Sequence, residues 1–159
     1  MKTTQTIVEI ASSNENLSTF SKAIEAAGLV DTLSSAGTYT IFAPNNDAFE
    51  KIDASTLTKL LEPEDETYVE KIKQFILRGT LESSAPILVK DFPHETITVD
   101  TMSGEEITVH SFYEQTKQSV DVYVGTKLKT PGHVVTGDVV ASNGVIHIID
   151  GCIGTVPWV

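Results

Sequence analysis

The residues best placed for chemistry in this sequence are a histidine and an aspartate near its C-terminal end. The stretch ASNGVIHIID (141–150) puts His147 between apolar neighbours and Asp150 three residues later. Such a pair could move protons, because histidine changes its charge near neutral pH and a carboxylate can hold its ring in one orientation. The two can act together only if the elements that carry them bring their side chains into contact.

Those elements are predicted to be the strands of a β-hairpin. Asn143-Gly144 between two apolar runs favours a type I′ turn, which would place Val140 opposite His147. Both faces are mostly apolar, so the hairpin should be covered on both sides. We interpret His147 as a core histidine with a hydrogen-bonding partner, the alternative being a ligand or proton-transfer role. Strand alternation puts Val145, His147 and Ile149 on one face, and Ile146, Ile148 and Asp150 on the other.

The sequence contains no other pattern typical of a catalytic or metal site. Its four histidines, His94, His110, His133 and His147, lack a metal-ligand spacing such as H-x-x-x-H. G-x-S-x-G, Walker A, G-x-G-x-x-G and calcium-loop patterns do not occur. The one cysteine, Cys152, follows an apolar run and is expected to be buried and inert. We therefore expect no enzymatic activity, no cofactor and no bound metal.

Length and charge narrow the classes of partner. The chain has 159 residues, 40% of them apolar, and 11 Lys and Arg against 22 Asp and Glu give a net charge of −11. These values fit a single globular domain over 1–159, and they argue against binding to nucleic acid or anionic lipid. No stretch approaches the roughly 20 apolar residues of a transmembrane helix. No signal peptide is recognisable, so either the protein is cytoplasmic or a targeting segment has been removed.

Helices are expected in the first half and strands in the second, which is the pattern of an α+β domain. Either Asn14 or Asn16 could cap the second helix, which should stop at Gly28, and Asn16 also begins a formal N-glycosylation sequon. Spacing of apolar residues predicts helices over 7–11, 17–27 and 66–77, strands over 97–99, 107–109 and 120–124, and a long hairpin over 134–149.

Between the helices lies TYTIFAPNNDAFEKI (38–52). Tyr39 to Phe42 is predicted to be a short strand that ends at Pro44, because proline cannot donate to a ladder. Asn45 or Asn46 should cap a short helix whose inner face carries Phe49.

The segment HSFYEQTKQSVDVYVG (110–125) is longer than a strand connection requires, and it contains Phe112, Tyr113 and Tyr123. One interpretation is ordinary strand packing. The other is an aromatic surface for a protein partner or an apolar ligand, since rings with polar tips favour recognition.

Two stretches, 38–52 and HVVTGDVVASNGVIHIIDGCIGTVP (133–157), together resemble the two signature boxes of the fasciclin (FAS1) family, with GLVDTL (28–33) also in the expected place. The resemblance implies a wedge-shaped β-sandwich with N-terminal helices packed against it. It also implies an extracellular or cell-surface location, a role in adhesion, and structural roles for the box residues. These are Thr40, Phe42, Pro44, Asn46, Phe49, Asn143, Gly144, His147 and Asp150.

The chain departs from the family after the long helix. Members often carry a Tyr-His pair there that is implicated in integrin-type adhesion, whereas this segment is FILRGTL (75–81). We therefore expect no Tyr-His-dependent contact. The leading hypothesis is a non-enzymatic adhesion or protein-binding module with an unidentified protein or matrix partner and weak self-association. Because some microalgal members bind carotenoids, the alternative is a binder of an apolar small molecule such as a carotenoid or lipid.

Overall fold

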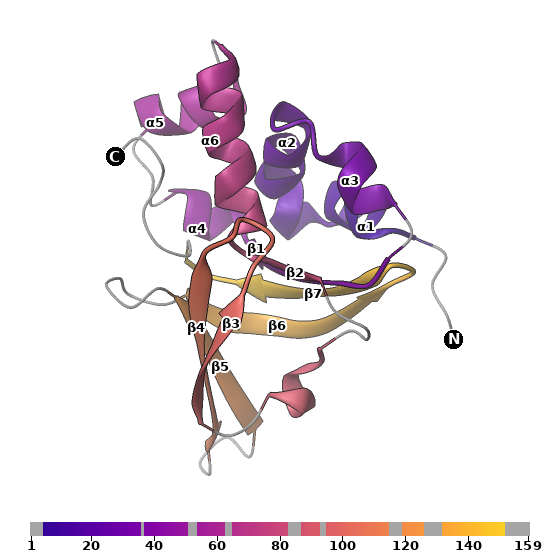
Figure 1. Cartoon of the computed structure of the whole chain (residues 1–159), viewed down its shortest axis with the longest axis vertical. Coiled ribbons are helices and arrows are strands. Elements are labelled where there is room, and N and C mark those ends of the chain that lie inside the picture. Colours follow the sequence, from indigo (N-terminus) through magenta and orange to yellow (C-terminus); the bar gives the residue numbers. More distant parts are fainter. Residues whose placement is uncertain are drawn as a thin grey trace.

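The computed structural model of this chain describes residues 5–35, 37–50, 54–62, 65–82, 87–92, 95–114, 119–125 and 132–151. Within these residues, seven strands form a sheet in the order β2-β1-β7-β6-β5-β4-β3. The helices lie on one side of β1, β2 and β7 (Figure 1). The α+β class expected from the sequence is therefore confirmed.

The helices are α1 (Ile7–Ser13), α2 (Ser18–Ala26), α3 (Val30–Ser34), α4 (Asn46–Glu50), α5 (Ala54–Leu61) and α6 (Glu66–Leu77), with 3₁₀ turns η1 (Glu15–Leu17) and η2 (Val89–Asp91). The strands are β1 (Tyr39–Pro44), β2 (Thr80–Glu82), β3 (Thr96–Asp100), β4 (Glu106–Glu114), β5 (Ser119–Gly125), β6 (Gly132–Ala141) and β7 (Gly144–Ile149).

Side chains at the helix ends explain where the helices start and stop. Thr6 and Glu9 form a capping box at the start of α1. The Asp65 carboxylate accepts two backbone N–H bonds at the start of α6. Gly28, with φ of 70°, ends α2 in the left-handed conformation that glycine adopts without strain.

The asparagines that the sequence left as alternatives have distinct roles. Asn14 caps η1 rather than α2, since its Oδ1 accepts from the Asn16 N–H at 2.9 Å. Asn16 itself is exposed on η1. Asn45 caps α4 by accepting from the Ala48 N–H at 2.8 Å. Asn46 therefore does not cap α4, and its side chain binds other helices instead.

In the part of the chain that the structure describes, two apolar cores lie on opposite faces of the central strands. Ile146 and Ile148 of β7 join the core under the helices, whereas Ile149 joins a second core with residues of β4 and β5. The alternation predicted for β7 is confirmed by this division. Because β3, β4 and β5 cross the direction of β1 and β7 and extend away from the helices, the second core fills the inside of a wedge (Figure 1).

The predicted register of the last hairpin is wrong. Ala141 pairs with Gly144, so the two-residue loop is Ser142-Asn143, and Val140 lies opposite Val145 rather than His147. Among the described residues, Asp138 is the only non-glycine residue with positive φ, so the type I′ turn is not formed. The physical reason is that distant partners hold the loop. The two strands of the hairpin are also not equally buried, because all of β7 is buried while Val140 on β6 is 56% exposed.

Candidate functional site

The tip of the β6–β7 hairpin is a buried polar centre built around Asn143. Its Oδ1 accepts a hydrogen bond from the Ile7 N–H of α1 at 2.9 Å. Its Nδ2 donates to the carbonyls of Leu33 and Ser35, at 2.7 and 3.1 Å. The asparagine is 6% exposed. One carboxamide thus satisfies three backbone groups at the ends of α1 and α3, which a shorter or apolar side chain would leave unpaired.

Backbone contacts complete this hairpin-tip clamp, the name used here for the partners of Ser142, Asn143 and Gly144. The Ser142 N–H donates to the Gln5 carbonyl at 2.8 Å, and the Tyr39 N–H donates to the Asn143 carbonyl at 3.0 Å. A Cβ at Gly144 would lie 2.0 Å from the Tyr39 carbonyl oxygen. Glycine is therefore required here by the close approach of β1.

His147 occupies a second buried polar centre on the opposite side of the sheet. Its Nδ1 accepts from the Asp138 N–H at 3.1 Å, so the proton of the neutral ring is on Nε2, which donates to the Ile87 carbonyl at 2.7 Å. The ring is fully buried. Burial lowers the pKa of His147 below its usual 6.5, and the Ile87 carbonyl and the Asp138 carboxylate only partly offset this.

The groups around His147 fasten the η2 segment to the sheet. The Ile87 N–H donates to Thr40 Oγ1 at 3.0 Å, and the Val89 N–H donates to Asp138 Oδ1 at 2.8 Å. Together with the His147–Ile87 bond, these contacts form what we call the η2 latch. The imidazole packs against Phe42 of β1, with ring centroids 5.6 Å apart.

Asp150 belongs to a different set of contacts. Its Oδ1 accepts from the His133 N–H at 2.9 Å, and its own N–H donates to the His133 carbonyl at 3.1 Å. His147 and Asp150 therefore bind separate backbone groups. The arrangement is that of two strand-fastening residues and does not support proton transfer between them.

Residues of the first box fasten α4 to the N-terminal helices. Asn46 Oδ1 accepts from the Thr19 N–H at 3.1 Å, and its Nδ2 donates to the Glu15 carbonyl at 2.8 Å. Phe49 is buried edge-on against Phe75 of α6, with centroids 6.2 Å apart. Pro44 ends β1 opposite Ile149. The structural role of the box residues stays a prediction, and these contacts are what it expects.

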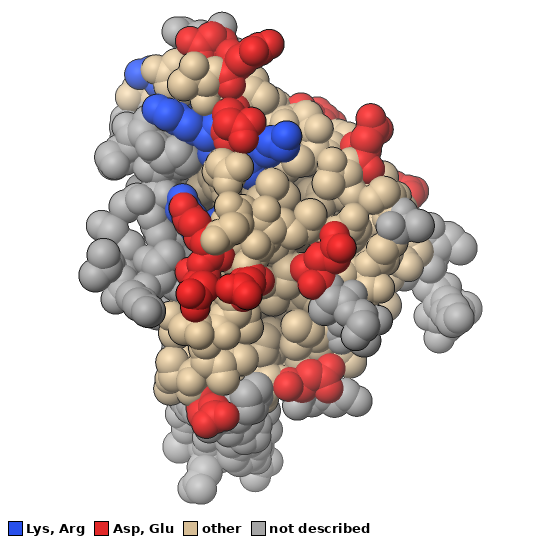
Figure 2. All heavy atoms as spheres, viewed as in Figure 1, with Lys and Arg blue, Asp and Glu red and all other residues tan. Residues whose placement is uncertain are grey.

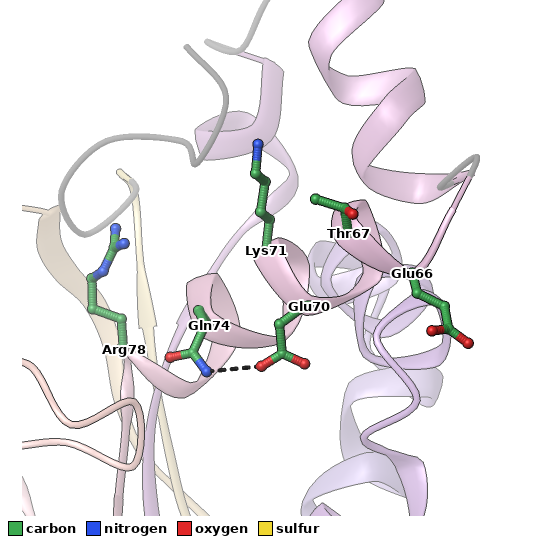
Figure 3. A pocket seen from close by; sticks show the side chains of 6 residues that line it. All are labelled: Glu66, Thr67, Glu70, Lys71, Gln74 and Arg78. Carbon is green, nitrogen blue, oxygen red and sulfur yellow. Dashed lines mark hydrogen bonds between the residues drawn. The ribbon is translucent and has the colours of Figure 1, made fainter.

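A surface groove follows the outer face of α6 (Figure 3). It has a volume of about 580 Å³ and is lined by Glu66, Thr67, Glu70, Lys71, Gln74 and Arg78, which we call the α6 groove. The Gln74 amide donates to Glu70, one turn earlier on α6, at 3.2 Å. At one end, Arg78 Nε donates to Glu105 Oε2 at 2.7 Å, and the Arg78 side chain is only 12% exposed. The lining carries both signs of charge.

Lysine and arginine are unevenly placed on this face of the molecule. Figure 2 shows acidic side chains spread over most of the face, with basic side chains gathered over the helical layer around α5 and α6. Lys71 lies 5.6 Å from the Tyr68 ring centroid, a cation–π distance. The α6 groove is thus a place where an acidic protein presents cations.

Sequence reasoning missed two features. The α6 groove has a signal in the sequence, because polar residues recur at spacings of three and four from Glu66 to Arg78, whereas the prediction of this helix rests on its apolar residues. The other is the irregular stretch at Asp138, where β6 shifts register between Thr136 and Val139. Gly137 beside it could have indicated a bulge.

The proposed aromatic surface lies largely outside the described residues. The backbones of Phe112 and Tyr113 are in β4 and that of Tyr123 is in β5, where Tyr123 pairs with His110. Their side chains are outside the described part of the structure, as are His94 and Cys152. Within the part that is described, no helix is long and apolar enough to cross a membrane, and no group of acidic, histidine or cysteine side chains could hold a metal.

The fold, together with the contacts made by the two signature stretches 38–52 and 133–157, defines a fasciclin-type α+β domain. A family model, described as the fasciclin domain, matches residues 15–155. The chain belongs to this family.

Relatives and solved structures agree with that assignment. Protein sll1483 of Synechocystis sp. is 37% identical over 146 residues, covering 91% of this chain and 71% of that protein. Transforming growth factor-beta-induced protein ig-h3 of Sus scrofa is 30% identical over 151 residues, 92% of this chain but 19% of that protein. A FAS1 domain pair from the insect cell adhesion molecule Fasciclin I shares the fold, with a TM-score of 0.77 at 19% identity over 93% of this chain and 50% of that one.

Proposed function

We propose that this chain is a non-enzymatic adhesion or protein-binding module that works outside the cell or at its surface. Family membership supports the proposal, and so does the shared fold with a domain pair from an insect cell adhesion molecule. The described contacts of the box residues are with neighbouring strands and helices, so we assign partner binding to the surface.

The α6 groove is the observation that carries the proposal. It is an open hollow on a well-supported helix, and its lining offers a lysine, two glutamates and an amide to an incoming chain. Mixed charge of this kind sets the register and specificity of a protein contact more than its affinity. The expected partner is a protein or matrix polymer that presents polar groups of both signs.

The test measures how much cellular and matrix material from the protein's source binds to the immobilised chain. Intact cells, matrix polymers and solubilised surface proteins from the source are passed over the chain and over Lys71→Glu. We expect the Lys71 variant to retain at least about fivefold less, because a reversed charge opposes a complementary one. Lys22→Glu, on the exposed face of α2 outside the groove, is the matched control and should retain as much as the parent chain.

Two results would reject the proposal. One is that the parent chain retains nothing from cells, matrix or extracts, and the other is that both lysine variants lose the same fraction. Thermal unfolding of each variant checks that the fold is intact. Analytical ultracentrifugation of the parent chain measures the weak self-association that accompanies the proposal.

The alternative is binding of an apolar small molecule, with Phe112, Tyr113 and Tyr123 as its candidate contacts. Among the described residues, the apolar void lined by Phe20, Phe75 and their neighbours holds only about 10 Å³, which is no more than one water molecule needs. A ligand of carotenoid size must therefore bind elsewhere. Visible absorbance of protein isolated from its source, and thermal shifts with carotenoids and lipids, would reveal it.

A further inference from the structure

The hairpin tip contains the only Asn-Gly pair in the chain, Asn143-Gly144. Asparagine is a chemically labile residue, and a following glycine favours its deamidation because no side chain shields the glycine nitrogen. In this reaction the Gly144 nitrogen attacks Asn143 Cγ, a new N–C bond forms, and Nδ2 leaves as ammonia. Water then opens the cyclic imide to give aspartate or isoaspartate. No oxidant or reductant is needed.

The folded structure opposes each step of this reaction. The carboxamide is held on both its oxygen and its nitrogen by Ile7, Leu33 and Ser35, so Cγ is not free to turn toward Gly144. Gly144 is buried as the first residue of β7 and lies against β1. Water has little access, since Asn143 is 6% exposed.

We propose that Asn143 is a conformation-gated deamidation site, whose amide survives while the hairpin-tip clamp is closed and is lost when the tip opens away from α1 and α3. The product cannot close the clamp again. A carboxylate has no hydrogen to donate, so the Leu33 and Ser35 carbonyls would face a negative charge without a donor. Isoaspartate would also lengthen the backbone by one carbon before Gly144, which displaces β7 against Tyr39. Each opening of the hairpin tip that leads to deamidation therefore leaves an irreversible chemical change at Asn143.

The test compares the folded chain with a synthetic peptide of residues 141–150 at the same mildly alkaline pH and temperature. Peptide-map mass spectrometry follows conversion of Asn143 over days. We expect the folded chain to react at least about a hundredfold more slowly than the peptide, and urea to bring its rate up to the peptide rate as the chain unfolds. Equal rates in chain and peptide, or a rate that urea does not change, would overturn the proposal.

A matched pair of helix caps separates local opening of the tip from global unfolding. Thr6→Ala removes the cap of α1 next to Ile7, whereas Asp65→Ala removes the cap of α6, far from the tip in sequence and contact. We expect Thr6→Ala to accelerate deamidation severalfold more than Asp65→Ala at equal loss of stability. Equal acceleration would show that only global unfolding exposes Asn143, and it would overturn local gating by the clamp.

Discussion

Replacing His147 by glutamine should make folding of this domain less sensitive to acid. In the folded chain the ring is neutral and fully buried, with Nδ1 accepting from the Asp138 N–H. Protonation would turn this acceptor into a donor and place a charge where no water reaches it. Glutamine cannot take up a proton at these pH values, so the variant lacks this source of acid sensitivity.

The size of the effect follows from proton linkage. Burial lowers the pKa of the folded His147 below 6.5, while the unfolded chain binds a proton at its ordinary value. Below pH 6.5 the unfolded state therefore holds more protons, and stability falls as pH falls. Between pH 7.5 and 5.5 one such group can remove at most about 1.4 kcal/mol of the free energy of unfolding.

Urea unfolding at pH 7.5 and 5.5 measures this loss for the parent chain and for His147→Gln. Other ionisable groups contribute to both, so the difference between the two losses isolates His147. We expect the parent to lose about 1 kcal/mol more than the variant. His110→Gln, at an exposed position on β4, is the control for a histidine-to-glutamine change outside the core. Equal acid losses in the parent and His147→Gln would refute the assignment of a buried neutral ring.

Three further changes test other contacts. Gly144→Ala should cost about 3 kcal/mol or more in urea unfolding, because its Cβ would lie 2.0 Å from a backbone oxygen of β1 that cannot move aside. Thr40→Val keeps the shape but removes the acceptor of the Ile87 N–H, so that amide should exchange hydrogen faster and stability should fall by about 1 kcal/mol. In a double-mutant cycle, Arg78→Ala and Glu105→Ala should show a coupling of about 1 kcal/mol or less, because Glu105 is 57% exposed to solvent.

The features that sequence predicted well are those set by neighbouring residues. The helix over 66–77 follows from residue spacing alone, and so does the shared face of Ile146 and Ile148 in β7. Buried residues recur about every 3.6 positions in a helix and every second position in a strand. The strands predicted at 97–99 and 107–109 are both present, and they pair with each other. These elements could be derived without any knowledge of distant contacts.

The register of the last hairpin could not be derived in this way. Local turn chemistry favoured Asn143 and Gly144 as the two central residues. In the fold, the Asn143 side chain is hydrogen-bonded to Ile7 and Leu33, and Gly144 pairs with Tyr39 in the sheet. Tertiary hydrogen bonds from residues more distant in sequence therefore outweighed a local preference.

The η2 latch shows the same limit for the candidate site. His147 was recognised as a core residue, but its partners Ile87 and Asp138 carry no pattern that links them to it in the sequence. A backbone carbonyl is available at every position, so residue types alone cannot reveal which one a buried histidine meets.

The central place of β7 has a consequence for how the chain is made. This strand is translated after every other helix and strand that the structure describes, yet it lies between β6 and β1, and Tyr39 of β1 pairs in parallel with Gly144. Its residues Ile146 and Ile148 cover the same core as the helices α1 and α2. Until β7 has left the ribosome, those helices have apolar faces without their partner strand. A nascent chain that stalls before Gly144 would therefore be a substrate for chaperones and proteases rather than a smaller folded domain.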